Sequence, residues 1–184
     1  MKPTVLTIVS GQPRSGTSLM MRCLELSGAP VICTERVSYE LEATAKLCSA
    51  NTWVYDLPHS GVLKVLFPQV MFLPPQTKDT RYKIIWLTRN YKQQARSQRK
   101  FLGATTDWQK ARYPHIKFAN KQTPRELRDS GAQVFTAHFE DLIKRSKQLK
   151  GALSAFLGFP FDDSAVRHRK SAAGKYALGE LEIG

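Results

Sequence analysis

The stretch TVLTIVSGQPRSGTSLMMRCLELSG, residues 4–28, decides the fold. Its first part, Thr4–Ser10, is a β-branched apolar run, which is typical of a strand buried on both faces of a sheet. The turn GQPRSGTS follows at residues 11–18, and LMMRCLELSG then indicates a helix that ends at Gly28. The order of strand, glycine loop and helix predicts the first unit of a parallel α/β sheet.

The rest of the chain continues this alternation. Further strands are predicted at 31–33, 61–67, 83–88 and 133–137, and further helices at 38–48, 91–102 and 142–158. Residues 103–122 show no convincing periodicity and are predicted to be loop with short helical pieces. The segment 161–184 is predicted to be a polar, basic tail. Strands that alternate with helices imply a central parallel sheet covered on both faces, so we expect one domain over residues 1–184, with three layers, α/β/α.

The composition is that of an ordinary globular chain. Hydrophobic residues make up 42% of the 184 and charged residues 23%. No apolar run approaches the roughly 18 residues that a membrane span needs, and the first apolar run is too short for a signal peptide. We therefore expect a cytoplasmic protein without a membrane partner. The three cysteines lack CxxC spacing and the histidines lack ligand spacing, which predicts reduced thiols and no metal site.

The net charge of +13 is unevenly distributed. Residues 1–80 carry seven Lys and Arg against six Asp and Glu, whereas residues 81–184 carry 21 against nine. A field of this sign attracts polyanions such as nucleic acid, acidic glycans or a multiply phosphorylated nucleotide. Charge alone does not choose among these partners.

The turn after the first strand has the glycine spacing of a phosphate-binding loop. Gly11 and Gly16 give the GxxxxG pattern of a Walker A motif, in which backbone N–H groups and a helix N-terminus face an anion. Thr17, however, stands in the place of the Walker lysine, and Arg14 is the cation within the loop. The clearest later strand is followed by Arg89 instead of a Walker B aspartate. We predict a P-loop-type fold that binds phosphate without the usual apparatus for Mg²⁺.

Three blocks resemble the sulfotransferase superfamily, whose members use 3′-phosphoadenosine 5′-phosphosulfate (PAPS). GQPRSGTSLM at 11–20 is similar to the 5′-phosphosulfate loop of these enzymes. In IIWLTRNYKQQARSQRKF at 84–101, an Arg at the strand end and a Ser on the next helix are similar to their 3′-phosphate-binding element. HFEDLIKRSKQLKGALSAFLGFP at 138–160 resembles their "EDL…FLG" segment. The chain also shares a YExE element, at 39–42, with a group of small bacterial sulfotransferase-like proteins.

The resemblance implies that PAPS is the cofactor, bound without metal and released as adenosine 3′,5′-bisphosphate. The residues it implies for the 5′-phosphosulfate are Gly11, Pro13, Arg14, Ser15, Gly16, Thr17 and Ser18. Those for the 3′-phosphate are Arg89 and Ser97, together with Arg169 and Lys170, whose segment has Ser171 where the superfamily has glycine. One loop cannot hold both ends of PAPS, whereas Arg89 can clamp a second phosphate bidentately and Ser97 can donate a hydrogen bond to it.

The catalytic groups are less well defined by the sequence. Transfer of the sulfuryl group needs a base for the acceptor proton and cations near the bridging oxygen. Arg14 and Lys64, which lies near a predicted strand end, are the candidate cations. The candidate bases, in order of rank, are Glu40 from the YExE match, Glu35 and His59.

Two other functions fit parts of the sequence. A P-loop kinase that uses ATP and Mg²⁺ would explain the fold and the loop, but neither the missing lysine nor the pair of Arg89 and Ser97. A non-enzymatic module that binds polyanions would explain the charge, but no known nucleic-acid-binding signature is visible. We therefore expect a sulfotransferase that acts on a hydroxyl or amine. The basic charge is compatible with an anionic or large acceptor, such as a glycan or a protein, and a homo-oligomer is compatible with the short chain.

Overall fold

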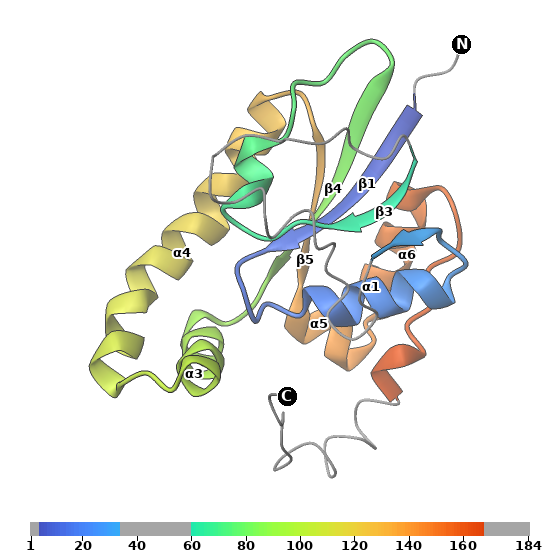
Figure 1. Ribbon diagram of the computed structural model, residues 1–184. Coiled ribbons are helices and arrows are strands. Elements are labelled where there is room, and N and C mark those ends of the chain that lie inside the picture. Colours follow the sequence, from blue (N-terminus) through green and yellow to red (C-terminus); the bar gives the residue numbers. More distant parts are fainter. Residues whose placement is uncertain (1–3, 34–59, 168–184) are drawn as a thin grey trace.

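A five-stranded parallel sheet lies at the centre of the computed structural model, which describes residues 4–33 and 60–167 (Figure 1). The strands are β1 (Thr4–Gly11), β2 (Val31–Ile32), β3 (Gly61–Lys64), β4 (Thr80–Thr88) and β5 (Gln133–His138). Their order across the sheet is β2-β3-β1-β4-β5, and every neighbouring pair is parallel. All five strands were predicted from the sequence, although β3 ends three residues earlier than expected because the chain turns at Phe67 and Pro68 into a short 3₁₀ helix.

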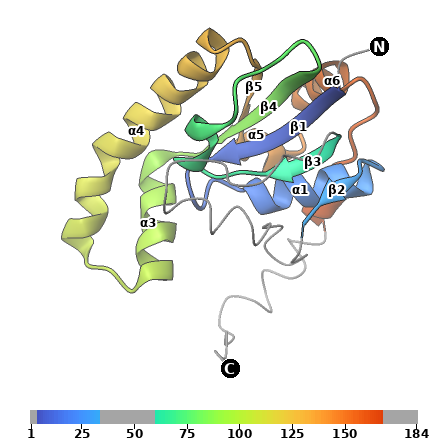
Figure 2. The same ribbon diagram turned by 45° about the horizontal axis from the view of Figure 1, so that its top comes forward.

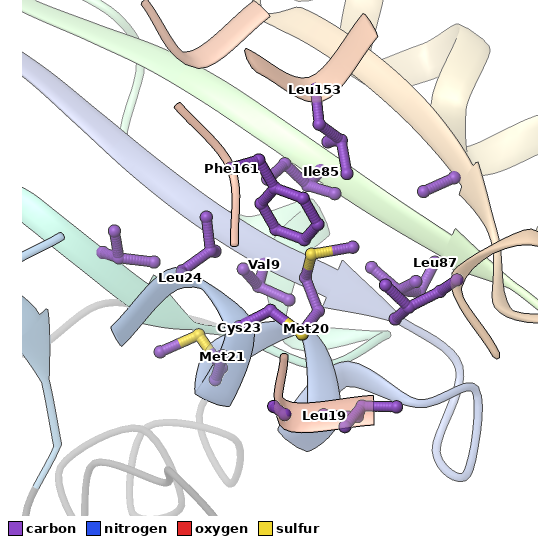
Figure 3. Close-up of a cluster of buried hydrophobic side chains, with 14 of the residues drawn as sticks. Val9, Leu19, Met20, Met21, Cys23, Leu24, Ile85, Leu87, Leu153 and Phe161 are labelled. Carbon is purple, nitrogen blue, oxygen red and sulfur yellow. The ribbon is translucent and has the colours of Figure 1, made fainter. Parts of the chain in front are cut away.

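Helices cover both faces of this sheet. They are α1 (Thr17–Leu26), α3 (Tyr91–Leu102), α4 (Thr106–Asp129), α5 (Phe139–Lys144), α6 (Lys147–Leu157) and the 3₁₀ helix η1 (Gln69–Phe72). One hydrophobic cluster joins β1 and β4 to α1 and α6, with members that include Val9, Met20, Ile85, Leu153 and Phe161 (Figure 3). A second cluster, on the opposite face, joins the strands to η1 and α4, with members that include Leu6, Leu63, Val70, Trp86 and Leu127. The predicted three-layer α/β/α arrangement is confirmed.

Helix α4 is the largest departure from the sequence-based expectation. Residues 103–122 were predicted to be loop with short helical pieces, and this prediction is wrong, because one helix of 24 residues runs from Thr106 to Asp129. Thr105 caps it by accepting a hydrogen bond from the Trp108 amide. The helix buries one stripe of side chains at helical spacing: Ile116, Ala119, Thr123 and Leu127. Two of these four are small or polar, so a search for apolar periodicity misses the stripe.

The single helix predicted over 142–158 is also wrong, because the structure has two. Helix α5 ends where Arg145 adopts a left-handed backbone, with φ of 57°. Ser146 then begins α6, and its Oγ accepts a hydrogen bond from the amide of Leu149 at 3.4 Å. Helix α6 shares its hydrophobic cluster with α1, whereas α4 covers the other face of the sheet (Figure 2).

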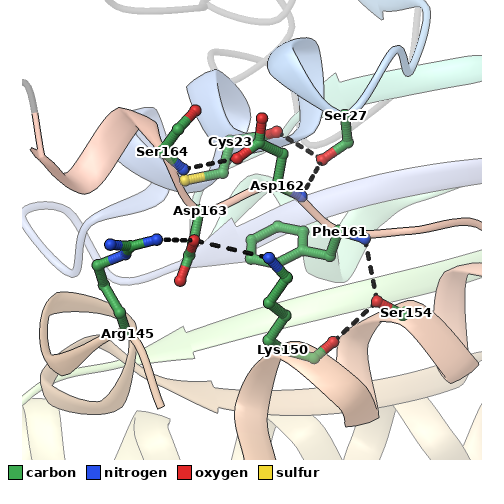
Figure 4. A network of polar contacts seen from close by, with 9 residues as sticks. All are labelled: Cys23, Ser27, Arg145, Lys150, Ser154, Phe161, Asp162, Asp163 and Ser164. Atoms are coloured by element: carbon green, nitrogen blue, oxygen red, sulfur yellow. Dashed lines mark hydrogen bonds and ion pairs between the residues drawn. The ribbon is translucent and has the colours of Figure 1, made fainter. Parts of the chain in front are cut away.

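The segment after α6 is not the polar tail that we predicted, at least as far as residue 167. Phe161 is buried in the core, its amide donates to Ser154 Oγ at 3.0 Å, and the amide of Asp162 donates to Ser27 Oγ at 2.7 Å (Figure 4). Asp163 accepts a hydrogen bond at 2.8 Å from Arg145, which lowers the pKa of its carboxyl group. These contacts fasten residues 161–167 onto α1, α5 and α6. The predicted helix 38–48 and the rest of the tail lie outside the described residues.

Cys23 lies beneath this segment. Burial raises the pKa of its thiol to about 12, and the nearby Asp163 and Asp162 carboxylates add to that shift. The thiol is therefore a buried, protonated core side chain, as the sequence predicted, whereas Cys33 is partly exposed.

Candidate functional site

The parallel register brings three predicted site elements to one edge of the sheet. Gly11 at the end of β1 is paired with Leu87, one residue before the end of β4, and Lys64 at the end of β3 is paired with Val9. The loop at 11–18, Lys64 and Arg89 therefore all lie at or just beyond the carboxyl ends of neighbouring strands. In open α/β sheets this edge is where ligands bind.

The loop between β1 and α1 needs its glycines. Gly16 has φ of 104°, and a Cβ atom there would lie 2.3 Å from Phe139 Cδ2. Gly11 has φ of 151°, and a Cβ atom there would lie 2.5 Å from the carbonyl oxygen of Leu87. Both positions thus combine a backbone that other residues rarely adopt with close contact to a neighbouring element. Arg14 adopts positive φ, 68°, without being glycine, which indicates a loop whose shape is imposed by its surroundings.

The N-terminus of α1 is arranged to receive a hydrogen-bond acceptor. Its N-cap is Gly16, no side chain caps it, and its first turn has no acidic residue. Helices α3, α4 and α6, by contrast, are each capped by a side-chain oxygen. Lys64, which is almost fully buried, donates from Nζ to Ser18 Oγ in this first turn at 3.3 Å. Amide donors, a hydroxyl and an ammonium group thus converge at the helix end, and this is the donor set that suits a phosphate group.

The structure brings the loop and the second predicted phosphate site together. Arg14 donates from Nε to Ser97 Oγ on α3 at 3.1 Å, although 83 residues separate them in sequence. Arg89 donates from Nη1 to the Arg14 carbonyl oxygen at 3.3 Å, and its guanidinium group lies 4.6 Å from the centre of the Phe139 ring. The two elements predicted to bind the phosphates therefore lie next to each other in the structure.

Sequence analysis missed three residues that shape this site. Phe139, the first residue of α5, packs on Gly16 and beneath Arg89. Gln94 and Gln98, on the buried side of α3, donate hydrogen bonds to carbonyl oxygens of the loop. The sequence carried no signal for the glutamines, because nothing in it shows which face of α3 meets a loop more than 80 residues away.

Several predicted residues lie outside the described part of the chain. They are the three candidate bases, Glu40, Glu35 and His59, and the two tail residues, Arg169 and Lys170. Over residues 4–33 and 60–167, no group of three or more His, Cys, Asp or Glu side chains is placed to hold a metal ion. None of the helices in that same part of the chain is long and apolar enough to cross a membrane.

Comparison with known proteins identifies the fold. No family model and no curated protein sequence matches the chain significantly. Among solved structures, a mouse sulfotransferase, SULT7A1, complexed with PAP matches with a TM-score of 0.52 and 15% identity, over 99% of this chain and 68% of the other. The sulfotransferase domain of the olefin synthase from Synechococcus PCC 7002 matches with a TM-score of 0.53 and 14% identity, over 98% and 82%. The chain has the fold of these sulfotransferases.

Proposed function

We propose that this chain is a sulfotransferase that moves the sulfuryl group of PAPS to a hydroxyl or amine of an acceptor by in-line transfer. The observation that carries this proposal is the contact between Arg14 and Ser97. It brings the loop that we propose to bind the 5′-phosphosulfate against the helix that we propose to bind the 3′-phosphate. A nucleotide with phosphates at both its 5′ and 3′ ends matches such a site, whereas a nucleotide with one phosphate chain uses only half of it.

PAPS fits the residues that are present. The loop amides, Thr17 and Ser18 would bind the 5′-phosphosulfate, and Arg89 with Ser97 would bind the 3′-phosphate. When bound, PAPS supplies a sulfuryl group joined to a phosphate that can depart with both electrons of the bridging bond. Lys64 and Arg14 are the cations of this chain that would stabilise negative charge on that phosphate. The base that takes the acceptor proton is proposed among Glu40, Glu35 and His59, in that order.

The position of Lys64 argues against the kinase alternative. In a Walker A motif, the lysine that contacts the phosphates follows the second glycine of the loop, where this chain has Thr17. Here an ammonium group reaches the same helix N-terminus from the adjacent strand β3. Strand β4 ends at Thr88 and Arg89 follows it, where a kinase would need an acidic residue to hold Mg²⁺. The site therefore offers donors that would suit a phosphate but lacks the metal ligand of a kinase at this strand end.

We further propose that the acceptor is anionic. Residues 91–129, which span the helices α3 and α4, carry ten Lys and Arg against three Asp and Glu, and so hold seven of the 13 net positive charges. Helix α3 contacts the loop at residues 11–18, and α4 runs from beside α3 up along the sheet (Figure 1). A positive surface next to the site raises the local concentration of a negatively charged acceptor.

Transfer of radiolabelled sulfate to matched acidic and neutral glycans tests the anionic acceptor. The acidic acceptor should be preferred, and the preference should fall as salt is raised from 50 to 300 mM or in a Lys110→Glu/Lys121→Glu variant, because both changes weaken the positive field. A neutral acceptor preferred at every salt concentration would refute this part of the proposal.

Calorimetric titration with adenosine 3′,5′-bisphosphate tests the function itself, with AMP and ATP–Mg²⁺ as comparators. We expect binding that requires the 3′-phosphate and no metal. Replacement of Arg89 by Ala should weaken binding of the bisphosphate by about 1.5–3 kcal/mol, the range for hydrogen bonds to charged groups. Arg81→Ala is the matched control, because Arg81 is an exposed arginine at the opposite end of β4. A preference for ATP–Mg²⁺ would favour the kinase, and equal affinity for AMP and the bisphosphate would refute the assignment.

A further inference from the structure

Two buried glutamines attach helix α3 to the phosphate loop. Gln94 donates from Nε2 to the carbonyl oxygens of Gln12 and Pro13, at 3.2 and 3.0 Å. Gln98, one turn later, donates from Nε2 to the Pro13 carbonyl oxygen at 2.8 Å. The side chain of Gln94 is fully buried and Gln98 is 4% exposed. Three hydrogen bonds thus hold two consecutive peptide groups at the entrance of the loop.

Packing alone does not explain these residues. The Oε1 atoms of Gln94 and Gln98 are buried and have no hydrogen-bond partner in the described part of the chain. A buried polar atom without a partner costs stability, so these side chains are explained by the hydrogen bonds that their Nε2 atoms donate and not by apolar packing. What apolar side chains could not do is hold the carbonyl groups of the loop in fixed positions.

The same helix carries the second anion-binding element. Ser97 lies between the two glutamines on α3 and contacts Arg14, while Arg89, just before the helix, contacts the carbonyl oxygen of Arg14. The loop is therefore attached to α3 and to Arg89 at three consecutive positions, Gln12, Pro13 and Arg14. These attachments fix the distance between the helix N-terminus of α1 and the pair of Arg89 and Ser97.

We propose that Gln94 and Gln98 are positioning residues that hold the loop against α3 and thereby set the separation between the two phosphate sites. The proposal rests on the proposed function, because the second site is assigned to the 3′-phosphate. A ligand that carries both phosphates gains most when the two sites are held at the separation that it spans. If the loop is held less firmly, the affinity that comes from binding both phosphates at once should fall more than the affinity for either phosphate alone.

The first experiment examines the free protein. Hydrogen–deuterium exchange is followed in peptides that cover residues 11–18, where the Ser15 amide donates to the Gln12 carbonyl oxygen at 3.1 Å. The variants are Gln94→Met and Gln98→Met, each of similar size and without the amide, and the matched control is Gln93→Met, an exposed glutamine on the same helix. Exchange of the loop should rise roughly fivefold in Gln98→Met, which loses one ordinary hydrogen bond, and more in Gln94→Met, which loses two. It should not rise in the control.

The second experiment measures how much the 3′-phosphate adds to affinity. The readout is the ratio of the dissociation constant of AMP to that of adenosine 3′,5′-bisphosphate. This ratio should fall roughly fivefold in Gln98→Met and further in Gln94→Met, which loses two hydrogen bonds instead of one. It should be unchanged in Gln93→Met. If the glutamines contributed only to stability, both nucleotides would bind more weakly by the same factor and the ratio would not change.

The outcomes separate the two proposals. Loop exchange that is the same in all three variants would overturn the positioning role, whatever the nucleotides do. Faster exchange with an unchanged ratio would leave the glutamines holding the loop and would overturn their part in setting the separation. If the wild-type protein binds the bisphosphate no better than AMP, the proposed function fails, and the separation role fails with it. The exchange data alone then decide whether the glutamines hold the loop.

Discussion

A single methyl group added at Gly16 should disrupt both the fold of the loop and the placement of Arg89. Gly16 has φ of 104°, and an added Cβ atom would lie 2.3 and 2.8 Å from two carbons of the Phe139 ring. The backbone conformation costs about 1–2 kcal/mol for alanine, and the overpacking adds about 1–3 kcal/mol. We therefore expect Gly16→Ala to lower the free energy of unfolding by about 2–5 kcal/mol, or the melting temperature by roughly 10 °C.

Two other glycines of this chain separate these contributions. Gly158 has φ of 86° and nothing within 4 Å of an added Cβ atom, so Gly158→Ala should show the backbone cost alone. Gly151 lies in the middle of α6 with open space around it, and Gly151→Ala should raise stability by about 0.5–1 kcal/mol. Urea denaturation of the three variants, compared at equal m-values, gives the difference between Gly16→Ala and Gly158→Ala as the cost of the contact with Phe139.

A double-mutant cycle then attributes that difference to the ring. Replacing Phe139 by Leu removes the two ring carbons that crowd the added methyl group, so the double variant Gly16→Ala/Phe139→Leu should lose less stability than the sum of the single variants. Because the Arg89 guanidinium group lies over this ring, Gly16→Ala should also weaken the bisphosphate. The reasoning is refuted if Gly16→Ala costs no more than Gly158→Ala, or if the two substitutions are additive.

Three further predictions concern the segments that support the site. Asp163→Asn should destabilise the protein at neutral pH. The folded pKa of Asp163 lies below its unfolded value, about 4, so its carboxylate stabilises the fold above that pH, and this stability is lost as pH falls through the folded pKa. Melting curves measured across a pH series should therefore show the wild type and the variant converging in acid. Cys23, with a pKa of about 12, should resist iodoacetamide at pH 8 in the native protein and react in urea, which peptide mass spectrometry reports; labelling of the native thiol would contradict its burial. Asn90→Ala should cost about 1 kcal/mol in urea denaturation, because Asn90 Oδ1 accepts from the amides of Lys92 and Gln93 at the start of α3, and an unchanged midpoint would argue against this cap.

The sheet and the loop could be predicted because each leaves a local signal in the sequence. Thr4–Gly11 is buried over most of its length on both faces of the sheet, so its apolar character is continuous. Gly11 and Gly16 adopt positive φ within the first βα turn, and their GxxxxG spacing is a local pattern. Arg89 lies at a strand end that the pattern of β4 defines. These features depend on residues close in sequence, or on burial that every residue of a strand shares.

Helix α4 and the break between α5 and α6 could not be predicted in the same way. Pro114 and Pro124 lie inside α4, where prolines usually indicate a helix end. The helix persists because its buried stripe, which includes Ile116 and Leu127, packs against the rest of the fold, and that packing is tertiary. Arg145 takes a left-handed conformation that sequence seldom indicates for arginine, and it is the residue whose guanidinium group holds Asp163.

The glutamines show why the candidate site was only partly visible in the sequence. Gln94 and Gln98 resemble exposed helix residues such as Gln93, and only the position of the loop, 81 to 85 residues away, gives them carbonyl oxygens to bind. A residue that contacts a phosphate is constrained by chemistry and recurs as a motif. A residue that contacts backbone carbonyl groups is constrained by geometry, which many side chains with an N–H group could satisfy. The separation between two phosphate sites can therefore be held by residues that no motif includes, and the Gln94 and Gln98 variants distinguish such a role from ordinary packing.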